Sequence, residues 1–240
     1  MNSKINTIIF DLDGTLLPMD AELFMSIYFD EMGKHFADLI DPRELINHVW
    51  SSTKAMITNL DHKTNEEVFM ADFEKRINGD LNIYTQRFDK FYDTLFSKTR
   101  QAVSENDFIK KSIQLLTEKG YTLAIATNPL FPKKAILQRI EWAGLEASDF
   151  SYITHYENNH YCKPQIQFYE EVLQDTNKSA DQCMMVGNDV REDLIAGNIG
   201  IKTFLIKDHM IHNGEDHIVS DYIGEYQDFY KFVINLPKLN

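Results

Sequence analysis

Two kinds of hydrophobic pattern alternate along this chain of 240 residues. In the first, short runs of apolar and β-branched residues stand between polar turns, which is typical of strands buried on both faces. We predict such strands at 8–10, 121–126, 150–154, 183–186, 201–206 and 218–223. In the second, apolar residues recur at helical spacing, and this pattern fills most of the sequence between the first two strands.

The segment 19–99 predicts four amphipathic helices joined by short loops. Asp41-Pro42-Arg43-Glu44 predicts a helix start, with Asp as cap and Pro at the first position, after which Trp50 is expected to face inward. Thr64-Asn65-Glu66-Glu67 predicts a second start with a capping box, for a helix that ends at Asn78-Gly79. The aromatic stripe of the fourth helix, over 84–97, is interpreted as core. Such helices can bury their stripes on one another, so we expect a small helical bundle.

From Ser104, the predicted cap of the next helix, helices of 10–15 residues alternate with the strands. This order predicts an α/β fold, a doubly wound (Rossmann-like) parallel sheet with helices on both faces. We expect residues 1–18 and 100–240 to form this core domain and residues 19–99 to form an inserted helical domain. Ligands of such sheets bind beyond the carboxyl ends of the strands.

The composition excludes several classes of function. The chain carries 24 Lys and Arg against 37 Asp and Glu, a formal charge of −13, which argues against a nucleic-acid partner. Cys162 and Cys183 are the only cysteines, too few for a disulfide framework, and favour a cytoplasmic location. No apolar run approaches the length of a membrane span, and the first residues do not resemble a signal peptide. The sequence predicts no oligomeric state.

The first predicted strand runs into Asp11-Leu12-Asp13-Gly14-Thr15. Two like charges about 4 Å apart cost roughly 4 kcal/mol at an effective dielectric of 20, so paired aspartates at a strand end indicate a bound cation. Hard oxygen ligands favour Mg²⁺. Gly14 allows close approach of the backbone to a ligand, and the amides of residues 12–15 can curl around an anion. The alternative is an ordinary acidic turn.

Two further strands end in polar residues, Thr127-Asn128 and Asn188-Asp189. Because parallel strands end at the same edge of a sheet, these side chains should lie near the two aspartates. Lys163-Pro164 predicts another helix start. Each feature also has a simpler reading: a capping pair, an acidic first helical turn, or a solvated lysine.

In this order, on these elements, the four segments resemble the four motifs of the haloacid dehalogenase superfamily of hydrolases. The first motif, DxDGT, is matched by residues 11–15, the second by Thr127, the third by Lys163 and the fourth by residues 186–193. The chain departs from the pattern where Asn188 stands directly after the glycine, a position at which the family commonly has Asp. The helical insert between the first two motifs looks like the family's helical cap.

The resemblance implies roles for these residues. Asp11 would attack phosphorus and form an aspartyl-phosphate, and Asp13 would donate a proton to the leaving oxygen and then activate water. Thr127, Lys163 and Asn128 would hold the phosphoryl group, together with the turn formed by Leu12, Gly14 and Thr15. Mg²⁺ would be bound by Asp11, the Asp13 carbonyl and Asp189. Asp193 would ligate the metal through water or orient Lys163.

Because members that cleave carbon–halogen bonds lack the second aspartate, Asp13 favours a phosphatase acting on a small phosphorylated metabolite. A phosphomutase of the same superfamily and a non-catalytic binding protein on this fold are the alternatives. The histidines offer a weaker candidate site: His209, His212 and His217 lie near Glu215 and Asp216, and we interpret them as a solvated loop. His155 and His160 are likewise expected in a surface loop.

Overall fold

The structure, a computed structural model, describes residues 5–214 and 217–239. Six parallel strands form one sheet in the order β3-β2-β1-β4-β5-β6. The sheet confirms the predicted α/β fold class, with the first strand of the chain at its centre. The strands are β1 (Thr7–Phe10), β2 (Thr122–Ile125), β3 (Tyr152–Ile153), β4 (Cys183–Gly187), β5 (Lys202–Ile206) and β6 (Tyr222–Gly224).

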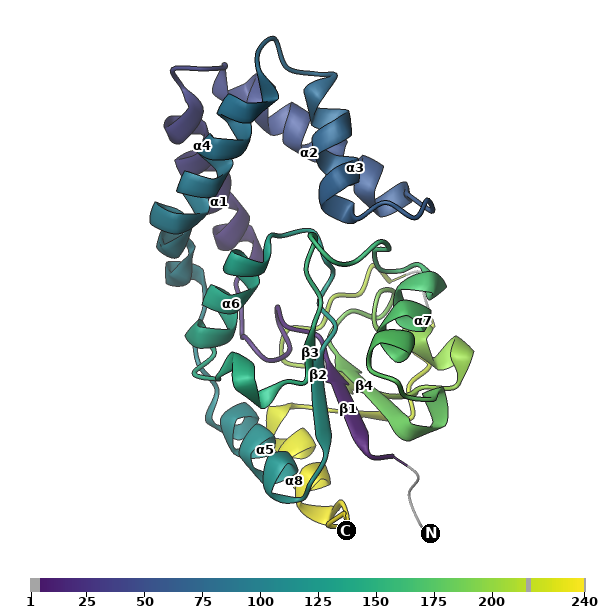
Figure 1. The fold of residues 1–240 in the computed structure, drawn as a ribbon. Coiled ribbons are helices and arrows are strands. Elements are labelled where there is room, and N and C mark those ends of the chain that lie inside the picture. The colour runs from purple at the N-terminus through teal and green to yellow at the C-terminus, as the bar shows by residue number, and fades with distance from the viewer. Residues whose placement is uncertain (1–4, 215–216, 240) are drawn as a thin grey trace.

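Helices cover both faces of this sheet because side chains alternate along each strand. Ile8 and Phe10 of β1 join the larger hydrophobic core, which includes α5 (Asp107–Glu118), α6 (Lys133–Trp142) and α8 (Tyr226–Asn235). Ile9 points the other way, into a second core with α7 (Ile166–Asp175). Figure 1 shows α5 and α8 side by side, in agreement with their extensive contacts.

The helical insert lies at one end of the molecule, away from the two chain ends (Figure 1). Aromatic rings fill the space between its helices; for example, Phe36 and Phe88 lie with ring centroids 4.7 Å apart. Phe36 and Phe73 are fully buried, and they belong to the same hydrophobic core as Ile8 and Phe10 of β1. Its elements are α1 (Ala21–Phe36), α2 (Pro42–Thr58), α3 (Asn65–Glu74), α4 (Leu81–Thr94) and the short 3-10 helix η1 (Phe96–Ala102).

The chain passes between core and insert twice, and the two passages are paired. Met19 and Val103 form an antiparallel β-bridge. The Asp20 amide donates to the Ala102 carbonyl at 2.9 Å, and the Ser104 amide donates to the Pro18 carbonyl at 3.1 Å. The two crossings therefore form one short two-stranded ribbon.

Local signals predicted most helix starts, with some differences. The capping box of Thr64 and Glu67 is present, and Asp41 caps α2. The prediction that Ser104 caps α5 is wrong because the Asn106 side chain accepts from the amides of residues 108 and 109 and so starts the helix later.

Three further expectations about the helices differ from the structure. The third helix of the insert, α3, ends at Glu74, before Asn78-Gly79. Helix α7 begins at Ile166, two residues after the Lys163-Pro164 pair. Trp50 was expected to face inward, but it is 51% exposed, because it stands at the rim of a cavity rather than in the packed interior.

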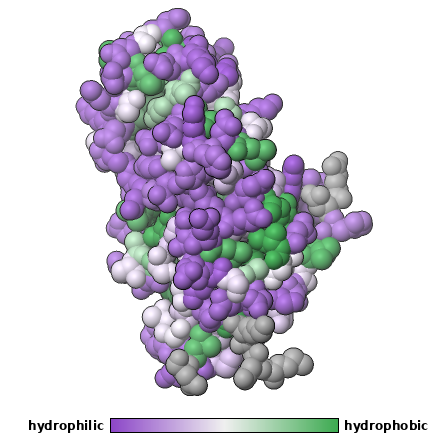
Figure 2. Space-filling model, turned by 45° about the vertical axis from the view of Figure 1, so that its right-hand side comes forward, coloured by the Kyte–Doolittle hydropathy of each residue, from purple (hydrophilic) through white to green (hydrophobic). Residues whose placement is uncertain are grey.

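The surface on the face drawn in Figure 2 is mainly hydrophilic, with hydrophobic side chains in small patches. Within the described ranges, no helix has both the length and the apolar character needed to cross a bilayer. The expectation about a signal peptide concerns residues 1–4, which lie outside the described residues, as do Glu215 and Asp216.

Candidate active site

The site is built on the turn that follows β1. The Asp11 amide donates to the Val186 carbonyl of the neighbouring strand at 2.9 Å, which holds the end of β1 against β4. Gly14 has φ +81°, and a Cβ there would lie 2.3 Å from Nδ2 of Asn188. Any larger residue would therefore push the fourth motif away from the first.

A buried ammonium group joins the first, third and fourth motifs. Nζ of Lys163 lies 2.9 Å from Oδ1 of Asp11 and 2.6 Å from Oδ1 of Asp193, and the side chains of Lys163 and Asp193 are each 1% exposed. The lysine lies in the loop that precedes α7, and the two aspartates follow β1 and β4. Residues that are 152 and 30 positions from Lys163 in the sequence thus form one ion-pair network.

Burial governs the protonation of this network. Burial raises the pKa of Asp11 to about 8, with the Asp193 and Asp13 carboxylates adding to the shift and Lys163 opposing it. Burial alone would lower the pKa of Lys163, but the Asp11 and Asp193 carboxylates outweigh it and hold that pKa above its ordinary value. The lysine is therefore a permanent positive charge at the site.

Asp193 is fully engaged within the protein. Its Oδ1 accepts from Lys163, and its Oδ2 accepts from the amides of Asn188 and Asp189 at 3.0 and 2.9 Å. A Cβ on Gly187 would lie 2.1 Å from that same oxygen. This arrangement suits the alternative in which Asp193 orients Lys163 better than direct metal ligation.

Asp189 and Asn188 occupy different surroundings although they are neighbours. Oδ1 of Asp189 accepts from the amides of Arg191 and Glu192, both at 2.8 Å, and burial raises the pKa of this carboxyl. The Asn188 side chain accepts from the Thr15 hydroxyl at 2.9 Å and donates to the His209 carbonyl at 2.7 Å. Asn188 therefore braces the first motif.

The turn itself is closed by internal hydrogen bonds. The Gly14 amide donates to the Leu17 carbonyl at 2.8 Å, and the Thr15 amide donates to the Leu12 carbonyl at 3.2 Å. Leu12 and Thr15 are fully buried. These two amides are engaged in the turn, so a substrate-binding role for Leu12, Gly14 and Thr15 stays a prediction.

Thr127 and Asn128 follow β2 and reach the same place. Thr127 is 3% exposed, and its carbonyl accepts from the Thr154 hydroxyl at 2.6 Å. The Asn128 side chain accepts from the Lys163 amide at 3.3 Å and donates to Glu192 at 3.1 Å. Asn128 therefore ties the second motif to the third and fourth.

Residues of the first, second and fourth motifs line one cavity of about 150 Å³ at the carboxyl ends of the strands. The predicted residues Leu12, Gly14, Thr15 and Lys163 are absent from its lining, although Lys163 contacts Asp11, which lines it. Its lining comprises Asp11, Asp13, Thr127, Asn128, Leu130, Phe131, Asn188, Asp189, Glu192, Asp193 and Ile211.

Sequence reasoning missed Arg139, which lies on α6 and is 1% exposed. Its guanidinium forms an ion pair with the Asp13 carboxylate and stacks on the Phe131 ring, 4.5 Å from the ring centroid. The pair fixes one oxygen of Asp13. A signal was available, because Ala135, Ile136 and Ile140 place Arg139 on the buried face of the helix.

Glu192 was also missed as a member of the site. Burial raises its pKa to about 7, and it accepts from Asn128 within the cavity lining. Its position in an acidic run gave no sign that this carboxyl, rather than its neighbours, would be enclosed.

The donors of the cavity fit Mg²⁺ in their chemistry. Asp11, Asp13 and Asp189 present hard carboxylate oxygens, and Oδ1 of Asp13 is buried without a hydrogen-bond partner. Across residues 5–214 and 217–239, however, no three His, Cys, Asp or Glu side chains converge closely enough to hold a metal ion. The carboxylates point instead toward Lys163, Arg139 and backbone amides.

The histidines lie apart from this cavity. His155 pairs with Glu157 at 2.9 Å, and His160 pairs with Glu171 at 2.6 Å. His209 contributes a carbonyl to Asn188, and within the described part of the chain no group of three metal-binding side chains includes the histidines near it.

The comparisons with known proteins identify the family. Residues 8–206 match the family model of haloacid dehalogenase-like hydrolases. The chain belongs to this family, as the resemblance of its motifs predicted.

Among its relatives is the pyrophosphatase PpaX of Bacillus cereus (strain Q1), 23% identical over 201 residues that cover 83% of this chain and 82% of that protein. Among solved structures, a HAD phosphatase from Thermococcus onnurineus aligns with a TM-score of 0.60 and 17% identity over 98% of this chain and 100% of that one. A predicted phosphoglycolate phosphatase from Haemophilus somnus 129pt aligns with a TM-score of 0.59 and 16% identity, covering 97% and 99% of the two chains. At these identities the structural likeness shows the fold.

Proposed function

We propose that this hydrolase is a Mg²⁺-dependent phosphatase that cleaves a phosphate monoester of a small molecule through an aspartyl-phosphate at Asp11. The observation that carries the proposal is the ion pair of Asp11 with buried Lys163, at 2.9 Å, beside a cavity that Asp13 also lines. A nucleophilic carboxylate, a second carboxylate for proton transfer and a fixed positive charge are what phosphoryl transfer requires.

In the first step an Asp11 oxygen attacks phosphorus, and the bond from phosphorus to the leaving oxygen breaks while Asp13 gives that oxygen a proton. In the second step Asp13 takes a proton from water, which attacks phosphorus, releases inorganic phosphate and restores the Asp11 carboxylate. Lys163 and Thr127 bind the phosphoryl oxygens. Mg²⁺, held by Asp11, the Asp13 carbonyl and Asp189, would supply charge that screens the nucleophile from those oxygens.

The relatives support phosphate chemistry through their names, as does the presence of Asp13. Release of inorganic phosphate from a panel of phosphate esters, with Mg²⁺ and with EDTA, tests the proposal. We expect turnover with Mg²⁺ that EDTA abolishes. Turnover that survives EDTA, or no turnover of any ester, would contradict it.

A phosphomutase would share every residue of the site. Activity toward a sugar phosphate that depends on added sugar bisphosphate, without net release of phosphate, would identify one. Equal phosphate release with and without the bisphosphate identifies the hydrolase.

A further inference from the structure

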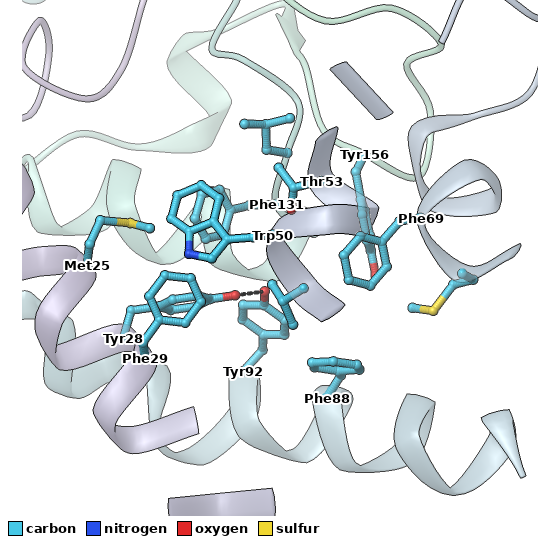
Figure 3. A pocket seen from close by; sticks show the side chains of 13 residues that line it. Met25, Tyr28, Phe29, Trp50, Thr53, Phe69, Phe88, Tyr92, Phe131 and Tyr156 are labelled. Atoms are coloured by element: carbon cyan, nitrogen blue, oxygen red, sulfur yellow. Dashed lines mark hydrogen bonds between the residues drawn. The ribbon is translucent and has the colours of Figure 1, made fainter. Parts of the chain in front are cut away.

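A second cavity, of about 300 Å³, lies between the helical insert and the core (Figure 3). All four insert helices line it, α1 with Tyr28, α2 with Trp50 and Thr53, α3 with Phe69 and α4 with Tyr92. The core completes it through loops after β2 and β3. Figure 3 shows these rings turned toward a common space.

This cavity is aromatic and uncharged. Its 13 lining residues, all within the described ranges, include no Asp, Glu, Lys, Arg or His. Two of its buried hydroxyls, those of Tyr28 and Tyr92, are hydrogen-bonded to each other at 2.8 Å (Figure 3). Burial raises the pKa of Tyr92 to about 12 and holds the pKa of Tyr28 well above its ordinary value, so both phenols stay neutral.

The cavity adjoins the candidate active site. Leu130 and Phe131 line both. Arg139, which is not part of the cavity lining, stacks on the Phe131 ring and is paired with Asp13, and its charge also acts on the Tyr28 and Tyr92 hydroxyls. A phosphoryl group beside Asp11 would therefore have its ester group near this aromatic cavity.

We infer that this cavity binds the leaving group and that the substrate is the phosphate monoester of an uncharged, apolar, ring-containing alcohol. The inference rests on the proposed phosphatase function. Apolar rings would be buried against Trp50, Phe69 and Phe131, which is favourable, and a pocket of this volume can accommodate a small ring system. A leaving group with its own negative charge would lose its hydration here without gaining a cationic partner.

The inferred substrate differs from the compounds that appear in the names of the relatives. Pyrophosphate and phosphoglycolate each carry a second anionic group on the leaving side, which an uncharged cavity does not complement. We therefore expect this protein to discriminate against both compounds.

Turnover of 2-phenylethyl phosphate, phosphoglycolate and pyrophosphate with Mg²⁺ tests the inference. The first two are esters of alkyl alcohols, so their comparison reflects binding more than leaving-group reactivity. We expect kcat/KM for 2-phenylethyl phosphate to exceed the other two by at least about 100-fold. Equal or greater activity on phosphoglycolate or pyrophosphate would overturn the inference and leave the phosphatase proposal standing.

Two variants test whether the preference for the aromatic ester depends on the cavity. Trp50→Ala removes a rim side chain that is 51% exposed, and we expect it to raise KM for 2-phenylethyl phosphate about tenfold with a smaller effect on kcat. Ile83→Ala, at a 49% exposed position of α4 outside the cavity lining, is the matched control and should change neither constant. An unchanged KM in a folded Trp50→Ala variant would overturn the inference.

Calorimetry with the product alcohol distinguishes failure of the phosphatase proposal from failure of the cavity assignment. 2-Phenylethanol should bind the wild-type protein and bind Trp50→Ala more weakly, whereas glycolate should not bind. Binding of the alcohol without turnover of any phosphate would defeat the phosphatase proposal alone. Absence of alcohol binding would defeat the cavity assignment.

Discussion

The two cavities that meet at Leu130 and Phe131 are built on opposite principles. The active-site cavity is lined by carboxylates, and two of them, Asp11 and Asp193, pair with the buried Lys163 ammonium in a network that joins three distant segments. The cavity beneath the insert holds rings and neutral hydroxyls. On the proposed function, the charged cavity would act on a phosphoryl group, and the uncharged cavity would select the group attached to it.

The largest effect should come from removing the nucleophile on the charged side. Asp11→Asn should lower turnover by at least about 10³-fold, because an amide cannot form the acyl-phosphate bond. Circular dichroism should show an intact fold, since Lys163 keeps its 2.6 Å partner Asp193. Activity near the wild-type level in this variant would show that Asp11 is not the nucleophile.

The buried charge that links the motifs should matter most for stability. Lys163→Met leaves Asp11 and Asp193 without their common partner, and we expect a loss of about 3–5 kcal/mol in the free energy of unfolding, measured with urea. Lys34→Met is the matched control, because that side chain is 64% exposed, and its unfolding should not change measurably. Equal stability of both variants would mean that the network contributes nothing.

Arg139 belongs to the boundary between the two cavities. Arg139→Lys keeps the charge but loses the planar contact with Phe131, so we expect kcat to fall about 10- to 100-fold through misplacement of Asp13. Steady-state kinetics on the best ester measures this. A change in KM alone would place Arg139 in substrate binding instead.

The uncharged side can be probed by a double-mutant cycle on its tyrosine pair. Tyr28→Phe leaves the Tyr92 hydroxyl buried without its 2.8 Å partner and should cost about 1–3 kcal/mol of unfolding free energy. The double variant with Tyr92→Phe should recover most of that loss. If the double variant loses the sum of two single effects, the hydroxyls are not coupled.

A further expectation concerns the pH dependence of stability in the metal-free protein. Asp11 has a pKa of about 8 when folded against an ordinary value of 3.8, so between these values the folded state holds a proton that the unfolded state has released. The contribution of Asp11 to stability is therefore present at low pH and lost as pH rises toward about 8. Urea unfolding in EDTA should show this slope in the wild type and less of it in Asp11→Asn.

Most of the fold could be predicted from the sequence, because strands and helix starts are marked by residues that are close together in the chain. Apolar runs marked the strands, and caps such as Asp41 and Thr64 marked helix starts. Strand ends also located Asp11, Thr127 and Asp189, since parallel strands share one edge. Lys163 came from the resemblance to the family, because no local pattern distinguishes a buried lysine from a solvated one.

What the sequence could not predict depends on how separate elements meet. The ion pair of Arg139 with Asp13 joins residues 126 positions apart, and a charged residue in a helix is usually solvated. The aromatic stripe over 84–97 was expected to be core, but its residues have two different surroundings. Phe91 and Phe96 are fully buried, whereas Phe88 and Tyr92 also line the aromatic cavity. Only the packing of four helices against two loops creates that space.

The paired crossings between core and insert have a mechanical consequence. Because Met19 and Val103 are bridged, and Asp20 and Ser104 extend the pairing, both connections must move together. Independent sliding or twisting of either passage would break their shared hydrogen bonds. Any rotation of the insert against the core would turn about this two-stranded connection and would also break the hydrogen bonds that the Asn65 and Glu66 amides donate to the carbonyls of Asn159 and Tyr156.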